Sequence, residues 1–398
     1  MIGGSAAPGY EPVARAFAQM MASGDEAGSA FAAVVDGIPV VDVWGGIAHR
    51  EPVTPWAKET VQLIFSGGKG LVATCILLLL DRGQLSLDRP VGSYWPAFGA
   101  AGKGGLLVRH LVSHQAGLPA VEPPPSGQEA LDPVEMAARL ARQPSRWPPG
   151  TAITYHALTF GWLCDGLVRQ VDGRSLGRFF AEEIAGPLGL DAWIGLPESA
   201  GSRVATMLRA PDYAVTFGDV NGEERELLTR IYAGGGIVGE RFIVNDRDFL
   251  RAEVAGVNAV ATARSMARLY GCLAADGVID GVHLLSPGTV RLALAPLATG
   301  RDQLTHKPLA FSCGFELQSE LQWYGPAASA FGHSGAGGSV HGAWPELHTG
   351  FSFGTNLMRR DDRDGRAQRL LGVLHAAVNS IRRRRSTDNP TLVEVKTG

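Results

Sequence analysis

The stretch Ile64–Gly70, IFSGGKG, with the apolar run Leu71–Leu80 that follows it, decides the fold prediction. Ser66 and Lys69 are three residues apart at the start of a predicted buried helix, so their side chains lie one turn apart on the same face. Unpaired N–H groups and the helix dipole favour negative charge at the serine. Burial disfavours the charged form of the lysine, which can then act as a base. The pattern predicts a serine nucleophile that is activated without a histidine–aspartate pair.

Two later segments carry groups that such a site needs. Trp147–Tyr155, WPPGTAITY, is a Pro-Gly turn that leads to a tyrosine and then to an amphipathic helix. Phe331–Ser339, FGHSGAGGS, is a glycine-dense strand entrance in which only small residues follow His333. A substrate backbone or acyl group can therefore lie against this edge.

In this order the segments resemble the serine β-lactamase and penicillin-binding-protein superfamily, which carries an S-x-x-K motif. His110–Pro119, HLVSHQAGLP, is similar to the family's HLLTHTSGLP segment, and Gly186–Leu190, GPLGL, is similar to its PLGM segment. The resemblance covers most of the chain and is nearest to class C β-lactamases and family VIII carboxylesterases. It implies a β-lactamase-like α/β (α+β) fold and a serine hydrolase that needs no cofactor or metal.

The resemblance also implies catalytic roles. Ser66 would be the nucleophile and Lys69 its base, while Tyr155 would match the tyrosine of the Y-x-N motif and move a proton between the serine and the leaving group. The backbone N–H groups of Ser66 and Ala336 would form the oxyanion hole, whose loss costs about 3 kcal/mol of barrier.

The substrate-binding residues depart from the lactamase pattern at two positions. His333, Ser334 and Gly335 stand where lactamases carry K-T-G, so a group that is mostly neutral at pH 7 replaces a permanent cation. Ala157 stands where lactamases carry asparagine. Both changes favour esters or other uncharged acyl donors over β-lactams. Trp344 is a further candidate for the acyl pocket.

Three other patterns suggest different chemistry. Gly350–Gly354, GFSFG, fits the nucleophile elbow of an α/β-hydrolase, but too little chain follows Ser352 to hold the remaining strands and triad loops. The terminal Lys396–Gly398 is a literal K-T-G, but we expect that it is not the lactamase motif, which lies on an inner strand and is followed by further structure. His110 and His114 have the spacing of two metal ligands on a helix but lack a nearby glutamate, so we expect no metal there.

Composition limits the compartment and the partners. The chain has 398 residues, 45% hydrophobic and 19% charged, which suffices for one large or two intimately packed domains. A net charge of −3 gives no basis for nucleic-acid binding. Met1–Ser5 shows no secretory signal, and Leu71–Leu80 is too short to span a bilayer. Four widely spaced cysteines in apolar contexts suit a reducing compartment, so we expect a cytoplasmic protein without a membrane partner.

Strands and helices are predicted at both ends of the chain, with a mostly helical segment between them. In order they are the helix Glu11–Met21, the hairpin Ala30–Gly46, the buried Ser66 helix, the helix Pro133–Arg142, the helix Ala261–Ala274, the strands Gly314–Gln318, Ser339–Trp344 and Gly350–Asn356, and a C-terminal helix. This arrangement predicts a mainly antiparallel sheet flanked by helices plus an all-helical lobe, with the active site in the cleft between them. The chain is predicted to form two domains. Residues 1–82 and 231–398 form a discontinuous α/β sandwich domain, and residues 83–230 form a mostly helical domain.

Two loop regions are also predicted. Gly201–Gly239 has few periodic elements and is predicted to form loops that border the cleft. His341 and His348 are predicted to be solvated loop histidines.

The predicted function is hydrolysis of small carboxylic esters through an acyl-enzyme on Ser66. An acyltransferase or transamidase would use the same acyl-enzyme with an amine or alcohol acceptor, and the sequence leaves this choice open. A weak β-lactamase and a non-catalytic binding protein on the same scaffold also remain open. The expected ligand is a small ester or acyl donor.

Overall fold

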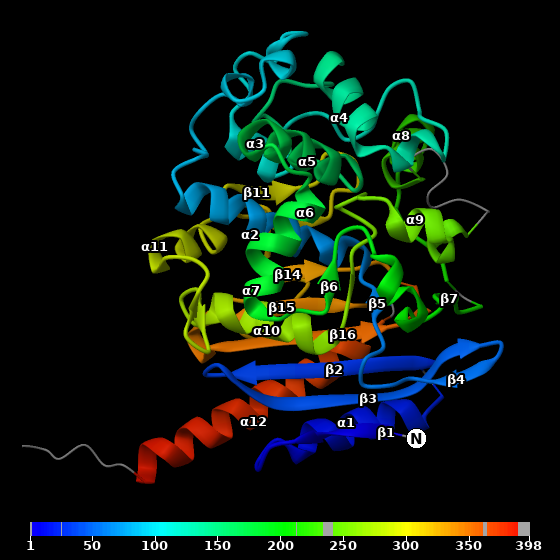
Figure 1. The fold of residues 1–398 in the computed structure, drawn as a ribbon, viewed down its shortest axis with the longest axis vertical. Coiled ribbons are helices and arrows are strands. Elements are labelled where there is room, and N and C mark those ends of the chain that lie inside the picture. Colours follow the sequence, from blue (N-terminus) through cyan, green and yellow to red (C-terminus); the bar gives the residue numbers. More distant parts are fainter. Residues whose placement is uncertain (1, 25, 212, 234–241, 361–363, 389–398) are drawn as a thin grey trace, which may run out of the picture.

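The computed structural model describes residues 2–24, 26–211, 213–233, 242–360 and 364–388. Within them, a ten-stranded sheet has the order β1-β3-β2-β16-β15-β14-β13-β12-β11, with β4 paired to β3, and every pair is antiparallel (Figure 1). Its strands are β1 (Ile2–Ala6), β2 (Gly28–Val35), β3 (Ile38–Arg50), β4 (Val53–Pro55), β11 (Ala298–Arg301), β12 (Pro308–Phe311), β13 (Glu316–Leu317), β14 (Phe331–Ser334), β15 (Val340–Trp344) and β16 (Thr349–Thr355).

Helices and short strand pairs surround this sheet. The helices are α1 (Glu11–Ala22), α2 (Gly68–Asp81), α3 (Val108–Val112), α4 (Pro133–Arg142), α5 (Thr159–Asp172), α6 (Leu176–Phe180), α7 (Gly186–Leu188), α8 (Gly222–Ala233), α9 (Arg247–Arg251), α10 (Ala263–Ala274), α11 (Pro287–Val290) and α12 (Arg366–Asp388). Three short strands form a small sheet in the order β5 (Gln62–Leu63), β8 (Val260–Ala261) and β6 (Ala192–Trp193). Two further pairs are β7 (Leu208–Arg209) with β17 (Leu357–Met358), and β9 (Val278–Ile279) with β10 (Val282–His283).

The sheet is covered on both faces, so its central strands are apolar throughout. All eight residues of β2 are buried. Phe31, Ala33 and Val35 pack in the core on the side of α1 and α12, whereas Ala30, Ala32 and Val34 alternate with them and pack on the side of α2 and α10. Figure 1 shows α1 and α12 beyond β3, and α3, α4 and α5 gathered at the opposite end of the molecule. The mainly antiparallel sheet flanked by helices that the sequence predicts is therefore confirmed.

The predicted elements agree with the structure where local signals are strong. α4 has the predicted bounds because Asp132 caps it, accepting from the N–H groups of Val134 and Glu135, and because Pro133 occupies its first turn. The predicted hairpin turns at Asp36, between β2 and β3. The domain division at residues 82/83 and 230/231 stays a prediction.

Two predicted segments differ from the structure. The strand predicted for Gly314–Gln318 is only Glu316–Leu317, because Gly314 has φ 81° in the tight turn between β12 and β13. The loops predicted for Gly201–Gly239 contain the helix α8, whose residues 227, 228 and 231 are buried in a small separate core. Residues 234–239 of that stretch lie outside the described residues, as does the terminal Lys396–Gly398. No helix in the described part of the chain is long and apolar enough to cross a membrane.

Candidate active site

The predicted nucleophile lies in a strained turn. Ser66 is half-buried in the 3₁₀ turn Phe65–Gly67, immediately before α2 rather than within its first turn. Phe65 has φ 46°, a left-handed conformation that costs a bulky residue energy and is typical of functional sites. This turn places Ser66 in the wall of a cleft.

The glycines that follow Ser66 allow three neighbouring segments to approach the start of α2. A Cβ at Gly67 would lie 2.5 Å from Cδ2 of His341 on β15. A Cβ at Gly68 would lie 2.7 Å from the Cβ of Ala259, and one at Gly70 would collide with the hydroxyl of Tyr270 on α10. The glycines of IFSGGKG are therefore required by packing around the nucleophile, and they do not indicate a flexible loop.

Lys69 is fully buried with its amine directed at Ser66. Its Nζ lies 3.1 Å from Ser66 Oγ and 2.8 Å from each of the carbonyl oxygens of Ala157 and Gly256. No carboxylate forms an ion pair with this amine among the residues that the structure describes. A neutral amine has two N–H bonds and one lone pair, so the two carbonyls can accept both N–H bonds while the lone pair faces the serine hydroxyl.

The environment of Lys69 favours that neutral form. Burial lowers the pKa of Lys69 to about 7, and the more distant Cys164 and Glu316 act weakly in the opposite direction. A substantial fraction of the enzyme therefore carries a free amine next to Ser66 at neutral pH. The arrangement can accept the serine proton, which is the chemical requirement for a base.

Tyr155 is held beside this pair by the segments around it. Its backbone N–H donates to Asp302 Oδ2 at 2.9 Å. Its ring lies against His114 and Phe311, with centroid separations of 5.0 and 6.3 Å. Lys69 Nζ is 4.9 Å from the centroid of the Tyr155 ring.

The Tyr155 phenol is a proton donor at neutral pH. Burial raises its pKa well above 10, and a side-chain hydrogen bond with Ser66 opposes this only in part. The hydroxyl form, and not a phenolate, is therefore present beside Ser66 before reaction.

The HLVSHQAGLP segment supports Tyr155. His114 is buried, and its Nδ1 accepts the backbone N–H of His156 at 3.0 Å. His156 in turn accepts the N–H of Leu118 at Nε2, at 3.1 Å, and its Nδ1 is 2.6 Å from the Thr154 carbonyl. Burial lowers the pKa of His156 to about 4, so this ring is neutral at pH 7. These histidines fix the backbone around the tyrosine.

The segment Phe331–Ser339, FGHSGAGGS, forms another side of the cleft. His333 on β14 is buried, and burial lowers its pKa to about 3, so it carries no charge at pH 7. Its Nδ1 lies 2.9 Å from the Ser334 carbonyl, and its ring centroid is 6.1 Å from that of Tyr155. A Cβ at Gly335 would collide with the Ile64 carbonyl, so this glycine lets the motif rest on the segment that carries Ser66. Ala336 follows in a turn that lines the same cleft.

A buried ion cluster that sequence reasoning missed holds this turn. The guanidinium of Arg366, at the start of α12, donates to the carbonyl oxygens of Gly337 and Leu357 at 2.9 and 3.0 Å. It also pairs with Glu26 and Asp364, each at 2.6 Å. No motif marks these residues in the sequence, because an isolated arginine before a C-terminal helix is ordinarily a surface residue.

The structure corrects the expectation that Trp344 lines the acyl pocket. Side chains alternate along β15, so Trp344 faces α12 while His341 faces α2. The Trp344 indole is fully buried, donates to the Tyr324 carbonyl at 2.6 Å and packs on Phe351. It does not contribute to the cleft lining.

His341 was also predicted wrongly as a solvated residue, and its true place explains the GFSFG motif. It is fully buried, with Nδ1 2.7 Å from the hydroxyl of Ser352. Gly350 allows close approach of α10 at Gly271, and Gly354 allows the approach of Gln62. Ser352 thus lies inside the sheet and away from the cleft lining, as the prediction of a strand residue requires. His348 is exposed, as predicted.

The cleft has a volume of about 260 Å³ and a mainly apolar wall. Ser66, Tyr155, Ala157 and the segment His333–Val340 contribute to it. Sequence reasoning missed many of its other residues, which are apolar or single polar side chains from distant segments: Leu158, Tyr213, Val215, Tyr232, Val257, Asp302, Lys307, Leu309, Phe311, Glu316, Leu321, Trp323, Arg359, Asp364 and Gln368.

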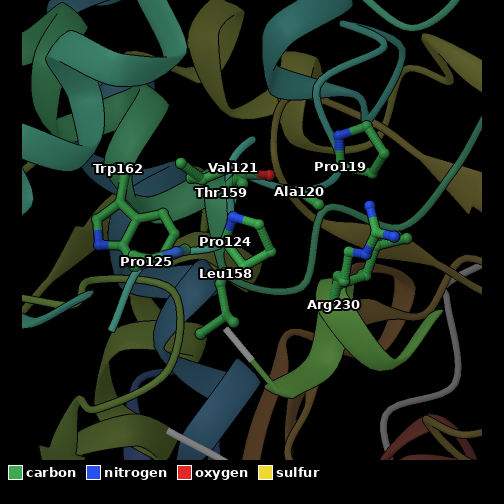
Figure 2. Close-up of a pocket in the computed structure, with 10 residues that line it drawn as sticks. Pro119, Ala120, Val121, Pro124, Pro125, Leu158, Thr159, Trp162 and Arg230 are labelled. Carbon is green, nitrogen blue, oxygen red and sulfur yellow. The ribbon is translucent and has the colours of Figure 1, made fainter. Parts of the chain in front are cut away.

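A second, smaller hollow adjoins the cleft through Leu158, which lines both (Figure 2). Figure 2 shows Pro119 and Pro124 on its wall with Trp162 and Arg230. Of the described residues that line this hollow, Arg230 alone is charged, and it pairs with Glu226 on the same helix.

The fold and these contacts define a β-lactamase-like serine hydrolase. The chain belongs to the β-lactamase family, whose family model matches residues 13–374. The esterase/β-lactamase LipL of Mycobacterium tuberculosis (strain ATCC 25618 / H37Rv) is 39% identical over 88% of this chain and 81% of its own length. A family VIII carboxylesterase of known structure is 34% identical with a TM-score of 0.88, covering 95% of this chain and 100% of that one. A penicillin-binding-protein homologue from Caulobacter crescentus has the same identity and coverage with a TM-score of 0.87.

Proposed function

We propose that this protein is a carboxylesterase that cleaves small, uncharged esters through an acyl-enzyme on Ser66. The observation that carries the proposal is the position of the Lys69 amine, 3.1 Å from the serine hydroxyl and without an ion-pair partner in the described chain. The similarity to an esterase/β-lactamase and to a family VIII carboxylesterase supports the choice of ester hydrolysis.

Acylation would begin with transfer of the Ser66 proton to the neutral Lys69 amine. The serine oxygen forms a bond to the acyl carbon, and the negative charge on the carbonyl oxygen is stabilised by the backbone N–H groups of Ser66 and Ala336. The bond to the alcohol oxygen then breaks, and the Tyr155 hydroxyl gives its proton to the leaving alkoxide. The Lys69 ammonium returns a proton to the tyrosine, which leaves Ser66 acylated, the Lys69 amine neutral and the Tyr155 hydroxyl protonated.

Deacylation would use the same groups in the reverse direction. A water molecule takes the place of the alcohol, gives its proton to the Tyr155 and Lys69 pair, and attacks the acyl carbon. The carboxylic acid leaves and the serine recovers its proton. An amine or alcohol in place of the water would yield acyl transfer, so the ratio of the two products measures which acceptor the cleft favours.

The residues at the K-T-G position and at position 157 favour uncharged substrates. A lactamase holds the substrate carboxylate with the cation of K-T-G, but burial lowers the pKa of His333 and keeps it neutral at pH 7. Ala157 presents a methyl group and uses its carbonyl to hold Lys69, so its side chain supplies no hydrogen bond to a substrate amide. Uncharged esters need neither contact.

Steady-state kinetics with p-nitrophenyl butyrate and with nitrocefin test this proposal. We expect efficient butyrate cleavage, little nitrocefin turnover, and loss of both in Ser66→Ala. Nitrocefin hydrolysis as fast as butyrate cleavage would contradict the argument from His333 and Ala157, and full activity in Ser66→Ala would contradict the proposed nucleophile.

We further propose a cytoplasmic location with a small-molecule substrate and no nucleic-acid or membrane partner. The four cysteines, Cys75, Cys164, Cys272 and Cys313, are free and buried, which suits a reducing compartment. The net charge of −3 favours no polyanionic partner.

A further inference from the structure

Glu316 is a carboxylate in the wall of the cleft that the proposed reaction does not use. It is half-buried at the start of β13 and pairs across the sheet with Gly332, the residue before His333. Glu316 and His333, the residue at the position where lactamases carry a lysine, both contribute to the lining of this cleft. Its charge is felt at both Lys69 and Tyr155.

The other carboxylates of the cleft are already occupied. Asp302 accepts the backbone N–H groups of Tyr155, Leu304 and Thr305, each at 2.9 Å. Asp364 binds the Arg366 guanidinium through both oxygens, at 2.9 and 2.6 Å. Each of these groups therefore has a structural partner.

The hydrogen-bond partner of the Glu316 carboxylate is an uncharged side chain. The Tyr324 hydroxyl donates to its Oε2 at 2.6 Å, and in the described part of the chain no lysine or arginine forms an ion pair with it. Burial raises its pKa, with the Tyr324 hydrogen bond and the Lys69 charge acting in the opposite direction. The Oε1 atom has no hydrogen-bond donor among the described residues, so a ligand group can bind there.

The cleft also contains two cationic side chains, Lys307 and Arg359, which have other contacts. Lys307 donates to the Thr216 carbonyl at 3.3 Å, and both it and Arg359 have further partners in the protein. A cationic ligand group at Oε1 would favour the ionised form of Glu316, whereas an anionic group at the same place would be repelled by it.

We propose that Glu316 is a specificity-determining residue, and that the cleft prefers esters carrying a cationic amine over equally long neutral esters and rejects those carrying a carboxylate. This inference rests on the proposed esterase function and names the charge class of its substrates. The amine would take the free Oε1 atom as its acceptor while the ester carbonyl lies at Ser66.

Two sets of matched esters test the inference at pH 7.5. The acyl set is the p-nitrophenyl esters of 6-aminohexanoate, heptanoate and adipate. The alcohol set is the butyrates of 3-hydroxybenzylamine, 3-ethylphenol and 3-hydroxyphenylacetate. We expect kcat/KM for the cationic member of at least one set to exceed that of the neutral member by about tenfold, and the anionic member to be the slowest.

Glu316→Gln keeps the shape of the side chain and should abolish this order, whatever its effect on the rate with the neutral esters. Glu320→Gln makes the same change at an exposed residue outside the cleft lining and should keep the order. In the unmodified enzyme, added salt should reduce the preference for the cation, which tests the charge interaction even if the Glu316 variant folds poorly.

The outcomes separate this inference from the proposed function. Equal kcat/KM for the three members of both sets, with cleavage that still depends on Ser66, would overturn the role of Glu316 and leave the esterase intact. A cation preference that persists in Glu316→Gln would also overturn it. Absence of Ser66-dependent cleavage of any ester would instead contradict the proposed function.

Discussion

At the scale of single residues, the chemistry depends on the loss of charge from Lys69. A lysine in water is a cation with no lone pair to offer, but this amine is fully buried between two carbonyl oxygens. The same burial raises the pKa of Tyr155 and keeps it protonated. The cleft thus provides a base and an acid from two residues whose ordinary pKa values lie near 10.

The pH profile of kcat/KM follows from this environment. Burial lowers the pKa of Lys69 to about 7, and below that pH the amine is protonated and cannot accept the serine proton, so kcat/KM should fall as the pH decreases through about 7. We expect an ascending limb near pH 7 with p-nitrophenyl butyrate. A profile that stays flat from pH 5 to pH 9 would show that another group acts as the base.

Replacement of Tyr155 by phenylalanine should separate its proton transfer from its packing. The ring contacts with His114 and Phe311 remain, but the proton for the leaving group is lost. We expect kcat to fall by about a hundred- to ten-thousandfold, with an unchanged melting temperature. Activity within threefold of the unmodified enzyme would exclude this role.

At the scale of elements, glycines allow several of the segments that form the site to approach one another closely. The turn after β14 rests on the backbone before Ser66 at Gly335, and Arg366 holds the same turn from the side of α12. Ala336 in this turn and Ser66 both line the cleft. The oxyanion hole that we propose depends on this spacing.

Gly335→Ala tests the spacing directly. The added Cβ would collide with the Ile64 carbonyl and displace the turn, and a displacement of about 1 Å costs about a hundredfold in rate. We expect a loss of that size in kcat. Gly372→Ala in α12, where a Cβ meets no other atom within 4 Å, is the matched control and should keep full activity.

Arg366→Met should destabilise the protein by about 3–5 kcal/mol, because it leaves Glu26 buried without its cation. Burial already raises the pKa of Glu26 to about 7 with the arginine present. Denaturant unfolding, monitored beside an exposed control such as Arg383→Met, measures the change. A loss below 1 kcal/mol would show that the cluster is not a principal anchor.

At the scale of the whole molecule, motifs predicted the fold and the groups that meet at the cleft, but not the residues between motifs. Ser66, Lys69, Tyr155 and His333 could be named because each stands in an ordered pattern. Trp344 was misplaced because the face on which a strand residue lies depends on register. Glu316 and Arg366 were missed because their importance arises from burial and from partners that are distant in the sequence.

If the GFSFG motif were the nucleophile elbow of an α/β-hydrolase, Ser352 and not Ser66 would be the nucleophile. If Ser352 serves packing inside the sheet, Ser352→Ala should lose only its hydrogen bond with His341, about 1 kcal/mol of stability, and should keep most of the activity. Thermal unfolding and butyrate kinetics on the same sample measure both quantities. Complete inactivation with native stability would favour the α/β-hydrolase interpretation.

Peptide mapping of a covalent fluorophosphonate adduct by mass spectrometry tests the role of Ser66 as the nucleophile most directly. We predict one adduct per chain, located on Ser66, slower labelling below pH 7, and no adduct in Ser66→Ala. An adduct on Ser352 or on any residue other than Ser66 would contradict this role.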